Sequence, residues 1–341
     1  SFLLVGMIPL LVMGWLSLSR SSEALSGQTF SQLEAIREIK KGQLENYFHE
    51  RQTNLNLLEE TVGVWRAEAG EKLTGLREAR RQEVERYFGT IEQQVLMMSE
   101  NPVVVSAMEQ LPDAFTAFPR ERGTKEDDAR LLRRYYEQDF AGQYRQVTGQ
   151  SPRTEALLSG MGEAATALQA AFLARNQHPL GSKHLLDASP AQTEYDQVHA
   201  SIHPMMLDYM ERFGYYDLFL VEPESGDIVY SVFKEIDFAT SLKTGAYADS
   251  GIGKAFRQAN QLASGDAAVL VDYERYKPSY EAPASFIASP IFRGGEKIGV
   301  IIFQMPIDRL NEILLARAGL GETGETYLVG PDQLMRSDSF L

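Results

Sequence analysis

The sequence predicts an α+β fold, in which a helical N-terminal part precedes an antiparallel five-stranded sheet. Up to Gly214, apolar residues recur mostly every three or four positions, which is the spacing of amphipathic helices. After Gly214 the pattern changes to short runs rich in β-branched and aromatic residues, separated by Gly, Pro, Ser and Asp. A helical segment before the last three runs favours an antiparallel α+β sheet.

Residues 1–19 are expected to form a transmembrane helix. No charged residue occurs from Ser1 to Ser19, and a membrane span needs about 20 apolar residues. Trp15 falls where an interfacial aromatic side chain would lie. The alternative, a signal-peptide core, is usually shorter, at about 7–15 residues. Because the chain does not begin with Met and stops abruptly, we expect it to be part of a longer membrane protein.

Residues 20–110 are expected to form long stalk helices, because two segments repeat at an offset of 40 residues. Ile36–Phe48 and Leu76–Phe88 share paired basic residues and a final Tyr-Phe, with apolar residues at helical spacing. Either two helices or one helix broken near Gly70 and Gly75 fits, since glycine costs about 1 kcal/mol per helical site. The apolar stripes suggest contact between helices across a homodimer. The simpler interpretation is a duplicated rod without a ligand role.

Residues 111–213 are expected to form a membrane-distal helical section. Its predicted helices span Glu126–Val147, Thr154–Asn176 and Thr193–Gly214, with a loop at Asn176–Pro190.

Residues 214–317 are expected to form the sheet domain. The predicted strands are Tyr216–Val221, Ile228–Phe233, Ala267–Tyr273, Ala284–Phe292 and Lys297–Met305, and the predicted helices are Gly251–Ala263 and Pro306–Arg317. The motif "FLVEP" returns as "YLVGP" at an offset of 108 residues. A second, truncated sheet domain is therefore expected at residues 318–341.

Composition excludes several classes of function. The chain has 341 residues, no Cys and a formal net charge of −14. Thiolate zinc sites and cysteine nucleophiles are therefore excluded. A broad nucleic-acid-binding surface needs clustered Lys and Arg, so no nucleic-acid partner is predicted. The sequence shows no nucleophile–base–acid set and no phosphate-binding loop, so neither catalysis nor a cofactor is predicted.

Four stretches of the sequence carry a family resemblance, namely Gly214–Leu242, Tyr276–Phe292, Gly299–Leu314 and Gly321–Ser339. They resemble the double Cache sensor regions of bacterial methyl-accepting chemotaxis proteins. The resemblance implies a PAS-like Cache sheet, the start of a second one, and a periplasmic sensor attached to the bacterial inner membrane. The long helical section before Gly214 departs from a minimal double Cache pattern.

The resemblance also implies a small-molecule site between the sheet and the loops that precede its last strands. The residues that fall there are Lys234 and Asp237 after the second strand, and Asp272, Tyr273, Tyr276, Tyr280 and Phe286 around the third and fourth. Tyrosines provide rigid apolar walls with a polar tip, and a few charges fix the orientation of a ligand. The alternative is a solvated crossover whose tyrosines pack on a helix. The class of ligand is left open.

A second candidate is a metal pair. His199 and His203 are four residues apart, so they share one helix face, with Asp196 one turn earlier and His184 nearby in sequence. Two histidines are an incomplete set of ligands and Pro204 follows at once, which favours packing near a helix end.

The sequence therefore predicts the sensing region of a transmembrane chemoreceptor, which transmits small-molecule binding through stalk helices to a cytoplasmic domain. One alternative is the same sensor attached to a membrane-bound cyclase or histidine kinase. The other is a structural or adhesive ectodomain without a small ligand.

Overall fold

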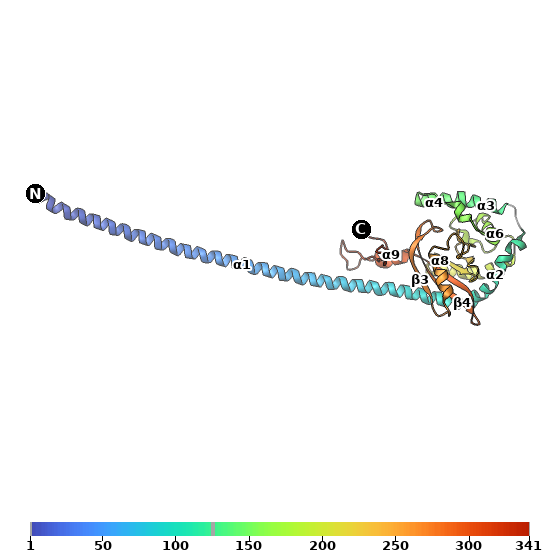
Figure 1. Cartoon of the computed structure of the whole chain (residues 1–341). Coiled ribbons are helices and arrows are strands. Elements are labelled where there is room, and N and C mark those ends of the chain that lie inside the picture. The colour runs from blue at the N-terminus through green and yellow to red at the C-terminus, as the bar shows by residue number, and fades with distance from the viewer. Residues whose placement is uncertain (1, 124–126, 341) are drawn as a thin grey trace. The chain divides into compact units, whose positions relative to one another are not determined.

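The computed structural model describes residues 2–123 and 127–340, with side chains from residue 6 onward (Figure 1). The chain divides into two units, Ser1–Gly75 and Leu76–Leu341, and each is described by itself. The first unit consists of part of helix α1, Phe2–Ser99, whose remaining turns belong to the second.

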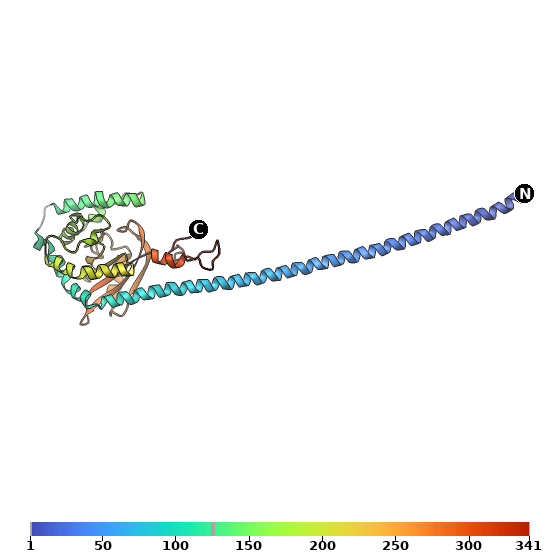
Figure 2. The same ribbon diagram turned by 180° about the vertical axis from the view of Figure 1, so that it is seen from behind.

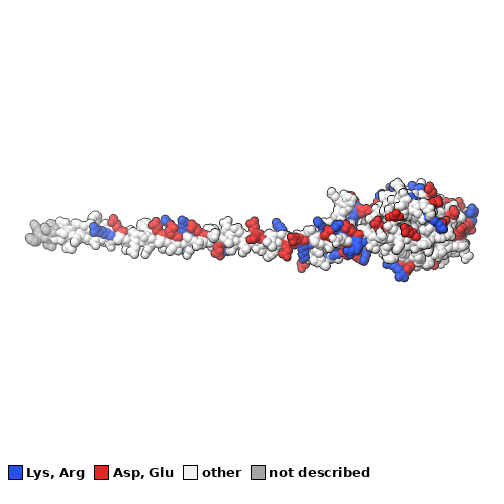
Figure 3. Space-filling model, turned by 90° about the horizontal axis from the view of Figure 1, so that it is seen from below, with Lys and Arg blue, Asp and Glu red and all other residues white. Residues whose placement is uncertain are grey.

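Helix α1 continues through Gly70 and Gly75, so the expected break is wrong. The penalty of about 1 kcal/mol per glycine is small where good helix formers flank it, because a helix that already exists propagates cooperatively. Along the face that Figure 3 shows, basic and acidic side chains are interspersed on α1. Among the described residues, no helix combines the length and apolar character needed to cross a membrane. The transmembrane helix predicted at residues 1–19 is therefore not confirmed, and five of its side chains lie outside the described set.

The second unit contains a helical layer between α1 and the first strand. Its elements are α2 (Pro102–Arg122), α3 (Asp128–Arg134), the π-helical turn η1 (Tyr135–Phe140), α4 (Ala141–Thr148), α5 (Thr154–Leu158), α6 (Glu163–Gln169), the π-helical turn η2 (Ala170–Ala174), the 3₁₀ turn η3 (Lys183–Leu185) and α7 (Glu194–Phe213).

Two of the predicted helices are interrupted. The one expected at residues 126–147 is divided by η1, and its first residue lies outside the described part of the chain. The one expected at residues 154–176 stops at Ser159, and Gly160 follows with a φ of +79° that ends α-helical geometry.

Helix α7 confirms its prediction, because both ends carry the expected signals. Thr193 and Asp196 form a capping box at the N-terminus, and Gly214 adopts a left-handed conformation at the C-terminus.

The sheet is antiparallel throughout, with strand order β2-β1-β5-β4-β3. Its strands are β1 (Asp217–Val221), β2 (Ile228–Ser231), β3 (Val269–Tyr276), β4 (Ala282–Arg293) and β5 (Glu296–Pro306), accompanied by α8 (Gly251–Gln261) and α9 (Asp308–Leu314). All five predicted strands are present. The expected crossover between the third and fourth is instead a tight hairpin, because β3 extends to Tyr276 and pairs with Ala282.

Alternating side chains divide the sheet between two cores. Leu218, Leu220 and Ile301 point to the core that contains α2 and α7. Phe219 and Ile302, one position along, point to the core that contains α8. Figures 1 and 2 show this sheet from opposite sides, with helices on both of its faces.

Residues 318–340 do not show a second sheet domain. Within this described segment there is one isolated bridge, Val329 to Met335, and no strand. A short apolar run becomes a strand only when a neighbour pairs with it over several residues. The second Cache domain and the predicted domain boundaries therefore stay predictions.

Candidate ligand site

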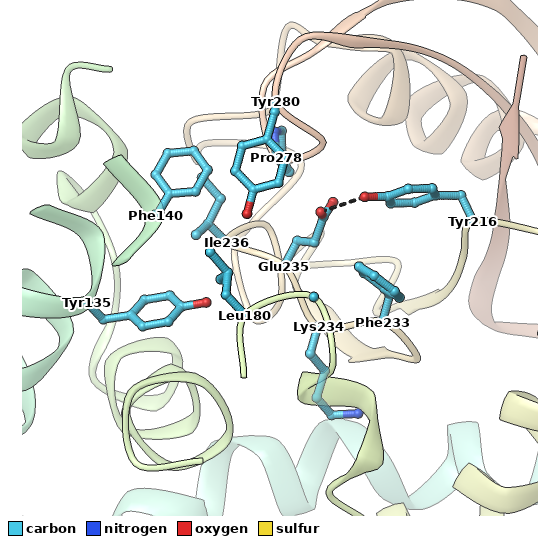
Figure 4. Close-up of a pocket in the computed structure, with 11 residues that line it drawn as sticks. Tyr135, Phe140, Leu180, Tyr216, Phe233, Lys234, Glu235, Ile236, Pro278 and Tyr280 are labelled. Carbon is cyan, nitrogen blue, oxygen red and sulfur yellow. Dashed lines mark hydrogen bonds between the residues drawn. The ribbon is translucent and has the colours of Figure 1, made fainter. Parts of the chain in front are cut away.

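The second unit contains a partly open cavity of about 90 Å³ beside the start of β1 and the end of β2 (Figure 4). Five aromatic side chains and one carboxylate dominate its wall. The lining residues are Tyr135, Phe140, Leu180, Gly181, Tyr216, Phe233, Lys234, Glu235, Ile236, Pro278 and Tyr280.

The π-helical turn η1 supplies two of the aromatic walls, Tyr135 and Phe140. Residues five apart in an α-helix point about 140° away from each other. The wider π turn, with its i to i+5 hydrogen bonds, brings them to the same side. The inserted turn therefore allows the first and last residues of η1 to face one cavity.

The segment after β2 is held in place by Asp217. The backbone N–H groups of Val232 and Phe233 each donate to Asp217 Oδ1 at 2.9 Å, and the Ser231 hydroxyl donates to Oδ2 at 2.8 Å. Lys234 follows with a φ of +61°, an uncommon conformation for a residue with a side chain. This fixed, strained turn directs Phe233 and Glu235 toward the cavity.

The β3–β4 hairpin supplies Pro278 and Tyr280. Tyr280 has a φ of +55°, a second non-glycine residue in the left-handed region on this wall. Its ring stacks on Phe140 with centroids 5.6 Å apart and an interplanar angle of 25°. Strained backbone of this kind persists where surrounding structure enforces it and is concentrated at functional sites.

Glu235 is the acidic group of the cavity. Its Oε1 accepts a 2.8 Å hydrogen bond from the Tyr216 hydroxyl, and its Oε2 accepts a 2.9 Å bond from Ser279 Oγ. Gln304 Nε2 in turn donates to Ser279 Oγ at 3.0 Å. These donors fix the carboxylate at the cavity wall.

Three carboxyl groups near this wall repel one another. Burial, with the charge of Asp237 next in importance, raises the pKa of Asp217 to about 7. The same two causes raise the pKa of Glu235, and burial raises that of Asp237. Each of the three therefore holds its proton more readily than an ordinary carboxyl group does.

Lys234, the basic side chain of the wall, turns away from the cavity in Figure 4. Its Nζ donates to the carbonyl oxygens of Ser231 and Val232 at 3.1 and 3.3 Å, and it lies 5.5 Å from the ring centroid of Tyr230. Burial lowers its pKa to about 7.

Of the seven residues predicted from sequence, Lys234 and Tyr280 line the cavity. Asp237, Tyr276 and Phe286 are buried in the core instead. The Tyr276 hydroxyl donates to Asp237 Oδ2 at 2.5 Å, and its ring packs edge-on against Phe286.

Asp272 and Tyr273 are not among the lining residues. Asp272 is exposed and pairs with Arg336 at 2.9 Å. The hydroxyl of Tyr273 donates to the carbonyl oxygen of Pro306, and its ring packs with Leu310 of α9. Because β3 continues past both residues, they belong to the strand rather than to a loop over the site.

Several cavity residues were missed from the sequence, namely Tyr135, Phe140, Tyr216, Phe233 and Glu235. On an α-helix Tyr135 and Phe140 would lie on different faces, so the helical spacing of the sequence did not indicate that they meet. Glu235 lies between the two residues chosen after the second strand. The positive φ of Lys234 turns the Lys234 side chain away from the cavity. The order of residue types in the sequence does not indicate such a backbone conformation.

The histidine pair packs in the core. His203 and His199 have ring centroids 4.5 Å apart, and each places one ring nitrogen on a backbone carbonyl, of His184 and Asp187 respectively. The other nitrogen of His203 lies 2.7 Å from the Tyr230 hydroxyl. Over the residues described, no group of three metal-binding side chains occurs.

No family model and no curated protein matches this chain. It is similar to the ligand-binding domain of the Pseudomonas fluorescens chemoreceptor CtaA in complex with L-serine, at 12% identity over 67% of this chain and 74% of that chain, with a TM-score of 0.30. The match to the same domain in complex with L-leucine spans 46% of that chain, at 14% identity over 36% of this one and a TM-score of 0.25.

The chain is also similar to the sensory domain of the Campylobacter jejuni chemoreceptor Tlp3 with isoleucine bound. The identity is 12% over 70% of this chain and 74% of that chain, with a TM-score of 0.30. The sensor domain of the V. cholerae histidine kinase DctB has 12% identity over 61% of this chain and 56% of that chain, with a TM-score of 0.25. Each of these structures is a ligand-binding or sensory domain of its own receptor or histidine kinase.

Proposed function

We propose that this chain is the extracytoplasmic ligand-sensing region of a bacterial transmembrane chemoreceptor, and that it is not itself an enzyme. The observation that carries the proposal is the partly open cavity with five aromatic walls and one hydrogen-bonded carboxyl group. Concave, mostly apolar sites with a few oriented polar groups are typical of small-molecule recognition. The Cache-like sequence stretches supply the receptor class, and the same sensor attached to a histidine kinase or cyclase is the alternative.

We further propose that the receptor is a homodimer held together along α1. Leu55, Leu58, Val62 and Trp65 alternate three and four residues apart and are 65%, 57%, 43% and 64% exposed. Most helical stability in proteins comes from packing of an amphipathic face, and this heptad spacing fits a coiled coil. A second copy of the chain is the partner that carries the matching face.

The proposed function is tested by a thermal-shift screen of the full chain with amino acids, organic acids, amines, sugars and nucleobases. A sensor should show saturable stabilisation by at least one compound, following RT ln(1 + [L]/Kd). The shift should be lost in Phe140→Leu, which removes a cavity wall. A library in which no compound raises the melting temperature would reject a direct sensor and favour a structural ectodomain.

A further inference from the structure

We propose that the cavity binds a small organic ammonium cation, such as a methylated amine, and not an amino acid or an organic acid. This inference rests on the proposed sensing function and deepens it by assigning the chemical class of the ligand. It depends on the composition of the wall, on its charge and on its size.

The wall combines aromatic rings with one carboxylate. The space is lined by Glu235 and by the rings of Phe140, Tyr216, Phe233, Tyr280 and Tyr135. The ring of Tyr135 already faces one cation, since Lys183 Nζ lies 5.6 Å from its centroid. A cation over aromatic rings is attracted by their negative faces, and this attraction is strongest where water is excluded. Figure 4 shows the hydroxyls of Tyr135 and Tyr280 directed into the same space. Each can accept a hydrogen bond from an ammonium N–H group.

The electrostatic balance favours a positive guest. Glu235 is the acidic side chain of the wall, while the Lys234 Nζ donates to backbone carbonyl groups away from the cavity. A cation beside Glu235 favours the ionised form of this carboxyl group. A ligand carboxylate would meet no basic partner there, because the lining residues contain no Arg and their Lys head group points elsewhere.

The size of the cavity limits the guest. A space of about 90 Å³ is well below the range of about 300–1,000 Å³ typical of drug-sized ligands. The guest is therefore expected to be small. A hard metal cation such as Ca²⁺ requires about six to eight oxygen ligands, which one carboxylate and two phenols do not supply.

The test is a calorimetric titration of the full chain with tetramethylammonium chloride and with methylammonium chloride. Sodium chloride at equal ionic strength, the neutral isostere tert-butanol, and glycine are the comparison ligands. Saturable binding of at least one ammonium salt is expected, at least tenfold tighter than binding of tert-butanol or glycine. Equal binding of tert-butanol, or a response to sodium chloride alone, would overturn the cation assignment.

Variants locate the site. Glu235→Gln keeps the shape and removes the charge, and it should weaken ammonium binding at least tenfold. Phe140→Leu removes an aromatic wall without touching the carboxylate and should also weaken it. Glu224→Gln, at an exposed acid of the β1–β2 turn that does not line the cavity, should bind as the natural chain does. Unchanged affinity in both cavity variants contradicts the proposal.

The screen of the proposed function separates the two ideas. If an uncharged or acidic compound binds and Phe140→Leu abolishes its binding, the sensing function stands and the ammonium assignment is wrong. If no compound of any class binds, the sensing function itself is wrong.

Discussion

The hydroxyl of Tyr276 donates a 2.5 Å hydrogen bond to Oδ2 of Asp237, and both side chains are buried. The other oxygen of this carboxyl group, Oδ1, is buried without a hydrogen-bond partner among the described residues. The bond from Tyr276 therefore compensates in part for removing this carboxyl group from water.

Tyr276→Phe should lower the free energy of unfolding by about 1–3 kcal/mol, the cost of leaving a buried polar group unsatisfied. Urea denaturation measures this change. Tyr273→Phe is the matched control, because its hydroxyl donates a longer 3.2 Å bond to the carbonyl oxygen of Pro306. A loss in Tyr276→Phe no larger than in the control would show that the bond to Asp237 is not stabilising.

The buried histidines predict a loss of stability in acid. Burial, followed by the charge of Lys234, lowers the pKa of His203 to about 3, and the same causes lower the pKa of His199. Because the unfolded chain takes up these protons more readily, stability is fully present above pH 6.5 and declines as the pH falls toward 3. His203 alone should cost about 2 kcal/mol at pH 5.

His203→Gln removes this titration and should show a flatter profile between pH 7 and pH 5. The carboxyl groups with raised pKa values act in the opposite direction in both proteins, so the difference between the two profiles isolates His203. Parallel profiles by chemical denaturation would mean that His203 does not carry the pH dependence.

A buried ion cluster joins α2, α3 and η2. Asp128, 6% exposed, pairs with Arg122 and, at 3.0 Å, with Arg175. Asp128→Asn removes the charge between two guanidinium groups and should reduce the free energy of unfolding by about 3–5 kcal/mol. Asp208→Asn, in the exposed pair with Arg212, should cost less than about 1 kcal/mol. Similar losses in both variants would contradict this ranking.

The proposed dimer is tested by a pair of neighbouring leucines on α1. Leu58→Lys alters the heptad seam, whereas Leu57→Lys changes an equally apolar residue, 61% exposed, outside it. Sedimentation analysis should show a dimer for the natural chain and for Leu57→Lys, and a shift to monomer for Leu58→Lys. If the natural chain sediments as a monomer, the dimer proposal is wrong.

Binding of an ammonium cation should release a proton from Glu235. Its pKa is raised by burial and by the charge of Asp237, so part of its population is protonated where an ordinary Glu is ionised. A cation favours the ionised form, so affinity should keep rising with pH above about 6, where an unshifted Glu gives a flat profile. Calorimetry in buffers of different ionisation enthalpy measures the number of protons released on binding. An affinity that does not change with pH would show that Glu235 releases no proton when the cation binds.

The sequence was sufficient for the sheet but not for the site. Short runs rich in β-branched and aromatic residues between turn signals defined all five strands, because strands buried on both faces leave nearly continuous apolar runs. The cavity depends on features with no such pattern, namely the π turn at Tyr135–Phe140 and the left-handed backbone of Lys234 and Tyr280. Local propensity does not predict these features, since neighbouring structure enforces them.

The π turn makes one wall of the cavity depend on the number of residues rather than on their identity. Deleting a single residue between Tyr136 and Asp139 would restore ordinary α-helical hydrogen bonding in a continuous helix from α3 to α4. Tyr135 and Phe140 would then be four residues apart, or about 40° around an α-helix, so both rings would stay on one face and the wall would survive the deletion. Regular α-helical bonding without the deletion would instead turn the two rings about 140° apart and remove one of them from the cavity.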